Sequence, residues 1–260
     1  MIGIFDSGVG GLTVAREVMK HLPTARILYF GDTARTPYGN KSKKTVVRYA
    51  LEDTQFLVDR GAAAIIIGCN TASAEATAEI KAAHPNLPIF DCITPAVTAA
   101  IAATKNGRIG LIGTRSTVNS GAYQRLIADH DAGLQLFAQA CPLLVPLVEE
   151  NWLKRPETKM ILRRYLRPLK EQRVDTLILG CTHYPLLAPL ISDTMGLRVT
   201  LVDPASEVTA FVAQTLAKQE WNHTTEHQFF VSDLSPATKQ IAMRWLGQDV
   251  NWQEAIVGDK

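Results

Sequence analysis

Short apolar runs that end at polar turns alternate with amphipathic segments along most of the chain. This alternation is typical of an α/β protein with parallel sheets. It predicts strands at 2–5, 26–30, 62–67, 88–90, 109–112, 135–140, 175–179, 197–202, 228–231 and 255–257. Helices are predicted at 12–21, 42–60, 72–83, 158–173 with a break at Pro168, 207–218 and 236–246.

Two of the predicted strands end in almost the same turn. The run 62–67 leads into Gly-Cys-Asn-Thr at 68–71, and the run 175–179 leads into Gly-Cys-Thr-His at 180–183, 112 residues later. Asp91 and Asp203 end two further strands at the same offset. The repetition predicts two similar open-sheet α/β domains related by internal duplication, with an active-site cleft between them.

The first of the two arrays is too short to complete a sheet alone. We therefore expect the C-terminal segment to return to it, which makes the first domain discontinuous. The predicted boundaries are 1–97 plus 207–260 for the first domain and 98–206 for the second.

Cys69 and Cys181 both follow a strand, at the sheet edge where open α/β folds bind ligands. Amides at the start of a following helix stabilise a thiolate and lower the pKa of a thiol. Two such thiols facing one cleft can act as acid and base on opposite sides of one molecule. The alternative is that both are inert core cysteines, but packing alone does not require the turn twice. Cys92 and Cys141 are assigned to the core.

Several polar residues allow two interpretations. The turn at 6–11 resembles a nucleotide loop, but Thr13 stands where G-x-G-x-x-G requires its third glycine. Asp6 and Ser7 then either cap the following helix or face an anionic ligand at its N-terminus. Tyr38 is either a pocket wall or a half-buried aromatic residue. The paired acids at 149–150 belong either to a surface turn or to the site.

Composition narrows the class of protein. The chain has 260 residues, of which 47% are hydrophobic and 20% charged, and a net charge of +2. This balance argues against nucleic-acid binding. No apolar run reaches the roughly 20 residues of a membrane span, and no signal peptide is evident, so we expect a cytoplasmic protein.

The spacing of the metal-ligating residue types predicts no metal site. The four cysteines show neither CxxC nor cluster spacing. His223 and His227 are four residues apart, but no apolar pattern supports a helix there. A disulfide framework is also not expected in a cytosolic chain.

Five motifs in order resemble the glutamate racemase family of the aspartate/glutamate racemase superfamily. They occupy 6–11, 37–39, 69–72, 146–149 and 180–185. The resemblance implies interconversion of L- and D-glutamate without a cofactor, in particular without pyridoxal phosphate, to supply D-glutamate for peptidoglycan. It also implies a homodimer.

The same resemblance assigns roles to residues. Cys69 would take the α-proton from D-glutamate and Cys181 from L-glutamate, with Asp6 and His183 assisting the thiols and Glu149 close to the site. The implied substrate-binding residues are Asp6, Ser7, Tyr38, Gly39, Asn70, Thr71, Thr182 and His183.

The residue types agree with this chemistry. An α-hydrogen is a very weak acid, so its removal needs hydrogen-bond donors aimed at the carboxylate, and Asn70, Thr71 and Thr182 are such donors. Two alternatives stay open: an aspartate racemase, and a catalytically silent amino-acid-binding protein of the same fold. The silent protein would be expected to lack one cysteine, and both are present.

Overall fold

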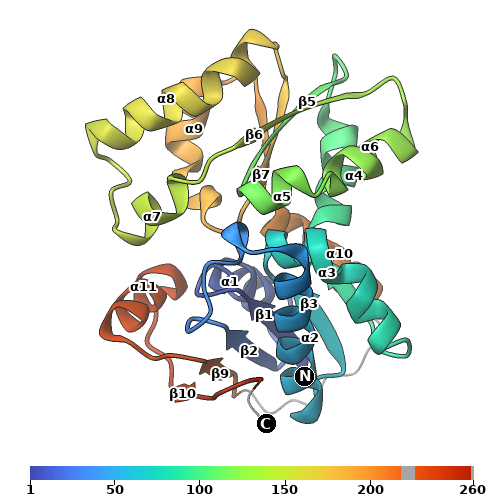
Figure 1. Ribbon diagram of the computed structural model, residues 1–260, viewed down its shortest axis with the longest axis vertical. Coiled ribbons are helices and arrows are strands. Elements are labelled where there is room, and N and C mark those ends of the chain that lie inside the picture. Colours follow the sequence, from blue (N-terminus) through green and yellow to red (C-terminus); the bar gives the residue numbers. More distant parts are fainter. Residues whose placement is uncertain (218–225, 259–260) are drawn as a thin grey trace.

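The computed structural model describes residues 1–217 and 226–258. These residues form two separate parallel β-sheets with helices packed on them (Figure 1). The predicted α/β class with two open sheets is therefore confirmed.

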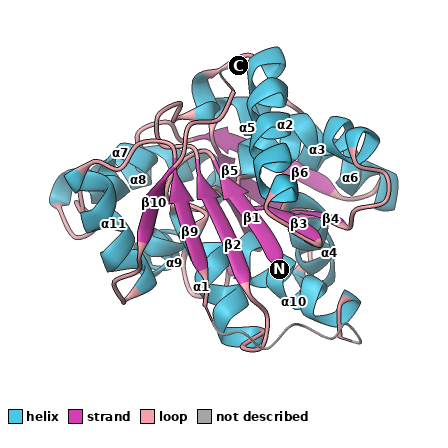
Figure 2. Ribbon diagram, turned by 90° about the horizontal axis from the view of Figure 1, so that it is seen from below, coloured by secondary structure: helices cyan, strands magenta, loops and turns pink. Residues whose placement is uncertain are grey.

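The larger sheet contains β1 (Ile2–Asp6), β2 (Ile27–Gly31), β3 (Ala64–Ile67), β4 (Ile89–Asp91), β9 (Gln228–Val231) and β10 (Trp252–Glu254). Its helices are α1 (Leu12–His21), α2 (Lys43–Asp59), α3 (Asn70–Ala83) and α11 (Pro236–Leu246), and a 3₁₀ turn, η1, spans Tyr38–Asn40. Its strand order is β10-β9-β2-β1-β3-β4, seen side by side in Figure 2.

The smaller sheet contains β5 (Arg108–Gly113), β6 (Gln135–Ala140), β7 (Thr176–Gly180) and β8 (Thr200–Val202), in the order β6-β5-β7-β8. The helices of this part are α4 (Ile93–Ala103), α5 (Arg115–Asn119), α6 (Ala122–His130), α7 (Leu144–Glu149), α8 (Pro156–Glu171) and α9 (Ala188–Met195). A 3₁₀ turn, η2, spans Tyr184–Leu187, and α10 (Pro204–Thr215) packs against both α1 and α4.

The central strands are buried on both faces. β1, β3 and β7 have no exposed position, and every pairing among the described strands is parallel. Helices that cover both faces of a parallel sheet explain why these strands read as unbroken apolar runs. β9 pairs with β2, so the chain does return to the larger sheet. The domain boundaries themselves stay a prediction.

Several predicted elements differ from the structure. α8 continues through Pro168, because Pro168 is exposed and water can solvate the carbonyl that loses its partner. The last strand is Trp252–Glu254 instead of 255–257. The predicted end of α10 at position 218 and the histidine at 223 lie outside the described residues.

The two cysteine turns also differ from each other. Cys69 is the N-cap of α3, which begins at Asn70, two residues before the predicted start, whereas Cys181 leads into η2 and α9 begins only at Ala188. Pro189 favours this arrangement, because it fits the first turn of α9 but would lose a hydrogen bond inside a helix that continued from Tyr184. Helix amides therefore lie close to the first thiol only.

Candidate active site

The two cysteines lie at the carboxyl ends of equivalent strands in the two sheets. Cys69 follows β3, and its Sγ donates to Ser7 Oγ at 3.4 Å while accepting from the amide of Ala72 at 3.5 Å. Cys181 follows β7, and its Sγ lies 3.7 Å from Nδ1 of His183. Both side chains are buried.

Both thiols line one small cavity, which draws its walls from both sheets. Nine of the predicted site residues line the cavity: Ser7, Tyr38, Gly39, Cys69, Asn70, Thr71, Cys181, Thr182 and His183. The predicted site residues therefore come together in one place.

Other lining residues were not predicted from the sequence. Thr36 and Pro37 belong to the loop before η1, whereas Thr114 and Val145 come from the smaller sheet's side. A second cavity shares these four residues and Gly39 with the first and is also lined by Glu149. The turn that begins at Thr114 follows β5 as the turn at Asp6 follows β1. The similarity of the apolar runs 2–5 and 109–112 is the sequence signal that could have placed Thr114 at the site.

Asp6 lies beside the cavity, at the end of β1. Its Oδ2 accepts from the amide of Gly8 at 2.9 Å, and its Oδ1 is buried with no hydrogen-bond partner among the described residues. The N-cap of α1 is Gly11, which receives no side-chain bond, so the capping interpretation of Asp6 and Ser7 is wrong. Burial raises the pKa of Asp6, and His183 and nearby amides offset this only in part.

The thiol of Cys69 is not activated in the way the sequence predicts. Burial, together with the charge of Asp6, raises the pKa of Cys69 to about 12. The bonds from Ser7 and from the amide of Ala72 lower the pKa by less. The expectation of a lowered pKa is therefore wrong for this thiol, because loss of water outweighs the helix amides. At neutral pH Cys69 carries its proton.

His183 connects Cys181 to a carboxylate. Its Nε2 lies 3.0 Å from Oε1 of Glu149, at the end of α7, whereas Glu150 is exposed. Burial lowers the pKa of His183, but the bonds to Cys181 and Glu149 raise it by more, to about 10. Of the paired acids, Glu149 is thus the one that reaches the site, and His183 is an imidazolium at neutral pH.

Small residues and hydroxyl groups bring the two sheets' loops together. Thr71 Oγ1 lies 3.0 Å from Thr114 Oγ1, and Tyr123 donates to Asn70 Oδ1 at 2.7 Å. A Cβ atom on Gly10 would overlap Oγ1 of Thr182 and lie 2.8 Å from Cε1 of His183. Only glycine permits this approach at position 10.

Tyr38 is fully buried, so the half-buried interpretation is wrong. Its hydroxyl is hydrogen-bonded to Asp32 and Asp53, and neither of these acids lines the cavity. Tyr38 and Gly39 therefore form part of the cavity wall, while the Tyr38 hydroxyl is bonded to acids outside the cavity.

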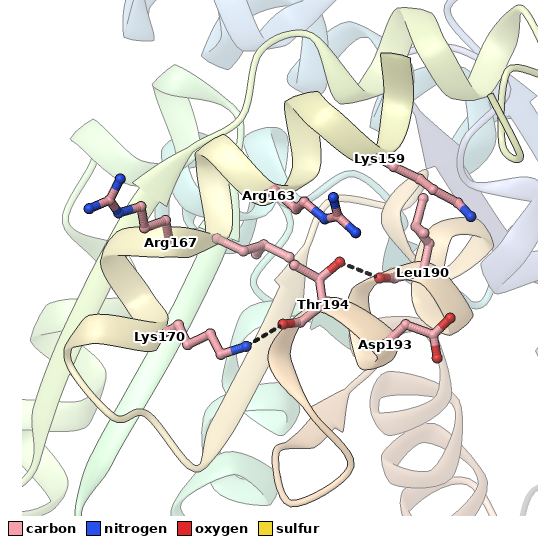
Figure 3. A pocket seen from close by; sticks show the side chains of 8 residues that line it. Lys159, Arg163, Arg167, Lys170, Leu190, Asp193 and Thr194 are labelled. Atoms are coloured by element: carbon pink, nitrogen blue, oxygen red, sulfur yellow. Dashed lines mark hydrogen bonds between the residues drawn. The ribbon is translucent and has the colours of Figure 1, made fainter. Parts of the chain in front are cut away.

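A larger groove between α8 and α9 has different chemistry (Figure 3). Its lining includes Lys159, Arg163, Arg167 and Lys170 and contains neither a thiol nor an imidazole. Arg167 pairs with Glu171 on the same helix, and Lys170 donates to the carbonyl of Thr194. None of its lining residues lines the cysteine cavity. The cysteine cavity is the better candidate for chemistry.

The described residues contain no group of three or more His, Cys, Asp or Glu side chains placed to hold a metal ion. Within the same residues, no helix combines the length and apolar character needed to cross a bilayer.

Known proteins are similar to this chain in sequence and in structure. Residues 13–212 match the family model described as Asp/Glu/Hydantoin racemase. A glutamate racemase from Neisseria meningitidis serogroup A is 43% identical over 98% of this chain and 96% of its own length. The crystal structure of glutamate racemase isoform RacE1 from Bacillus anthracis superimposes with a TM-score of 0.94 at 36% identity, covering 98% of this chain and 97% of that one.

A second solved structure contains a ligand. The glutamate racemase from Francisella tularensis, in complex with D-glutamate, has a TM-score of 0.91 and 33% identity, covering 98% of this chain and 96% of that one. Extensive identity over nearly the whole length, in sequence and in structure, leads to one conclusion. This chain belongs to the Asp/Glu/hydantoin racemase family and is an amino-acid racemase, an isomerase.

Proposed function

We propose that this enzyme interconverts L- and D-glutamate, with Cys69 and Cys181 as its two bases. The observation that carries the proposal is that both thiols, each at the end of a strand in a different sheet, line one small cavity. The similar chains are named glutamate racemases, and one of them is in complex with D-glutamate.

The surroundings of the thiols suit a two-base reaction. Each turnover requires one thiolate and one thiol. Burial and Asp6 keep Cys69 protonated, whereas Cys181 faces the His183 imidazolium. The thiolate of Cys181 takes the α-proton of L-glutamate, and the thiol of Cys69 gives its proton to the opposite face. D-Glutamate leaves, with the proton now on Cys181 and the thiolate on Cys69.

The remaining residues stabilise the intermediate charge. Hydroxyl and amide groups of Asn70, Thr71 and Thr182 line the cavity and can donate to the α-carboxylate as negative charge develops. Asp6 Oδ1 is a buried acceptor with no described partner, so the substrate's ammonium group is a suitable donor to it. Glu149 keeps His183 protonated and oriented.

Chiral chromatography of purified enzyme with L-glutamate, L-aspartate and L-alanine in turn tests the substrate. We expect D-glutamate to form much faster than the other D-isomers. Faster turnover of aspartate would identify an aspartate racemase. Binding of glutamate without turnover, measured by calorimetry, would identify the silent binding protein instead. Cys92→Ser is a matched control, because this thiol is buried outside the cavity.

The family resemblance also supports a biological role, a compartment and an oligomeric state for this enzyme. It implies D-glutamate supply for peptidoglycan in the cytoplasm, no cofactor and a homodimer. Dialysis against a chelator and treatment with hydroxylamine should leave activity unchanged. Sedimentation equilibrium should give twice the chain mass of 28.5 kDa.

A further inference from the structure

A cluster of charged residues, of which Asp32 and Asp53 are fully buried, lies behind one wall of the cavity. Arg35 bonds to three carboxylates: through Nε to Asp32 Oδ2 at 2.7 Å, through Nη2 to Asp53 Oδ1 at 2.9 Å, and through Nη1 to Glu52. Tyr38 completes the cluster, and Asp32, Tyr38 and Asp53 have no exposed surface. The cluster joins the loop after β2 to α2.

The hydrogen bonds of Tyr38 require one more proton than the tyrosine can supply. Its hydroxyl oxygen is hydrogen-bonded to Oδ2 of Asp32 and lies 2.9 Å from Oδ2 of Asp53. A phenol has one proton and can donate to only one of these oxygens. The other contact places two acceptors against each other unless a carboxyl group carries a proton.

The neighbours of the two acids show where that proton lies. Asp32 is surrounded by donors, because Oδ1 accepts from Ser232 at 2.9 Å and Oδ2 accepts from Arg35. Asp53 accepts from Arg35 only through Oδ1, so its Oδ2 faces Tyr38 alone. Asp53 Oδ2 is therefore the one position where a proton completes the network without displacing a donor.

We propose that Asp53 is protonated in the folded enzyme and that a directed chain, Asp53 to Tyr38 to Asp32, holds the loop 33–39 in place as a cavity wall. Asp53 is a positioning residue in this scheme. The effect on substrate affinity rests on the proposed glutamate racemase function, whereas the proton on Asp53 does not depend on it.

The local charges favour the same protonation state. The single guanidinium of Arg35 faces Asp32, Glu52 and Asp53, so three ionised carboxylates would leave excess negative charge in a buried site. Burial raises the pKa of Asp53 well above its usual range, and the charges of Asp32 and Glu52 add to this. Arg35 and the bond to Tyr38 lower the pKa by less.

The loop that this network holds contributes directly to the cavity. Thr36, Pro37, Tyr38 and Gly39 all line it. Gly39 packs so closely on the opposite side that a Cβ atom there would lie 2.7 Å from Cβ of Thr114. Ionisation of Asp53 would set two carboxylates against one hydroxyl, and the resulting shift of the loop would change the cavity.

Two reciprocal substitutions distinguish the acids. In Asp53→Asn, the amide NH₂ can donate to Tyr38 and the amide oxygen can accept from Arg35, so the chain is preserved. In Asp32→Asn, an NH₂ group must face one of the donors Ser232, Arg35 and Tyr38. We expect Asp53→Asn to remain within about twofold of wild-type KM at pH 7, and Asp32→Asn to raise KM about tenfold and lower the unfolding midpoint.

The pH dependence of stability is the second readout. At pH values between the pKa of Asp53 in the unfolded chain, about 3.9, and its higher pKa in the folded enzyme, only the folded state keeps the proton on Asp53. The unfolding free energy of wild type therefore falls as pH rises through this interval. Asp53→Asn removes this contribution, so the variant should gain stability relative to wild type from pH 5 to pH 9 in urea titrations.

Infrared difference spectroscopy observes the proton directly. The wild-type minus Asp53→Asn spectrum at pH 7 should contain the carbonyl band of a protonated carboxylic acid. Absence of that band would overturn the proposal, as would equal destabilisation by the two substitutions or an unchanged pH dependence in Asp53→Asn. If Asp32→Asn fails to fold, the infrared and urea comparisons still decide. Lack of glutamate turnover would contradict the proposed function and leave both results intact.

Discussion

His183 places its Nδ1 atom 3.7 Å from Sγ of Cys181. Cys69 has different neighbours, since its sulfur contacts Ser7 and the charge of Asp6 raises its pKa. One thiol of the proposed pair therefore faces a cation and the other an acid.

Replacing either thiol with serine should lower racemisation in both directions by about 10²–10⁴-fold, because each turnover needs a donor and an acceptor. Cys69→Ser should still remove the proton of the L-isomer through Cys181, and Cys181→Ser that of the D-isomer through Cys69. A glutamate analogue with a leaving group at the β-carbon measures this, since elimination needs one base. Cys92→Ser and Cys141→Ser serve as buried controls. Loss of elimination with the same isomer in both active-site variants would refute the facial assignment.

Glu149→Gln should lower the pKa of His183 from about 10, because the bond to the carboxylate is one of its causes. NMR titration of the His183 ring measures the change. Proton removal from L-glutamate should then decline at a lower pH than in wild type, since the neutral ring no longer places a positive charge beside Cys181. Glu150→Gln is the matched control, because Glu150 is the exposed neighbour. Equal titration shifts in the two variants would contradict the role of Glu149.

Asp6→Asn should lower the pKa of Cys69 from about 12, because the Asp6 charge is the second cause of its elevation after burial. Alkylation of Cys69 by iodoacetamide, followed by mass spectrometry, should therefore become faster at pH 9. Turnover should nevertheless fall about 10²-fold or more, since the buried acceptor for the substrate is lost. Asp129→Asn removes an exposed charge elsewhere and should change neither rate. Slower alkylation in Asp6→Asn would count against this electrostatic assignment.

Gly10→Ala should reduce kcat/KM by about 10²-fold, because the new methyl group would displace Thr182 and His183 from the cavity wall. Steady-state kinetics and the His183 NMR signal measure the two effects together. Gly133→Ala is a suitable control, since its Cβ would meet only the side chain of exposed Asp131. Wild-type kinetics in Gly10→Ala would show that the two sheets' loops separate readily at this point.

The sequence predicts those features that depend on neighbouring residues. The strand–turn pattern around Cys69 and Cys181 is local, so both cysteines and the polar residues after them were placed correctly at strand ends. The duplicated pattern also indicated two sheets. The sequence also predicts a helix directly after Cys181, but η2 comes first, because Pro189 fits the first turn of α9 better than the interior of a longer helix.

Features that depend on distant parts of the chain could not be predicted. The choice between Glu149 and Glu150 follows from how α7 packs beside His183, 34 residues away. The pKa of Cys69 was predicted in the wrong direction, since its burial requires walls from both sheets. The partners of Asp32 include Ser232, which is 200 residues further along the chain. No periodic pattern connects such residues.

The return of the chain to the larger sheet has a consequence for synthesis on the ribosome. All four strands of the smaller sheet lie before residue 203, so that sheet is complete as soon as this part has emerged. β2 is then still an edge strand, because its second neighbour, β9, begins only at Gln228. Its free amides and carbonyls can pair with other chains. During translation, the nascent enzyme therefore keeps this exposed edge until β9 emerges, even after the smaller sheet is complete.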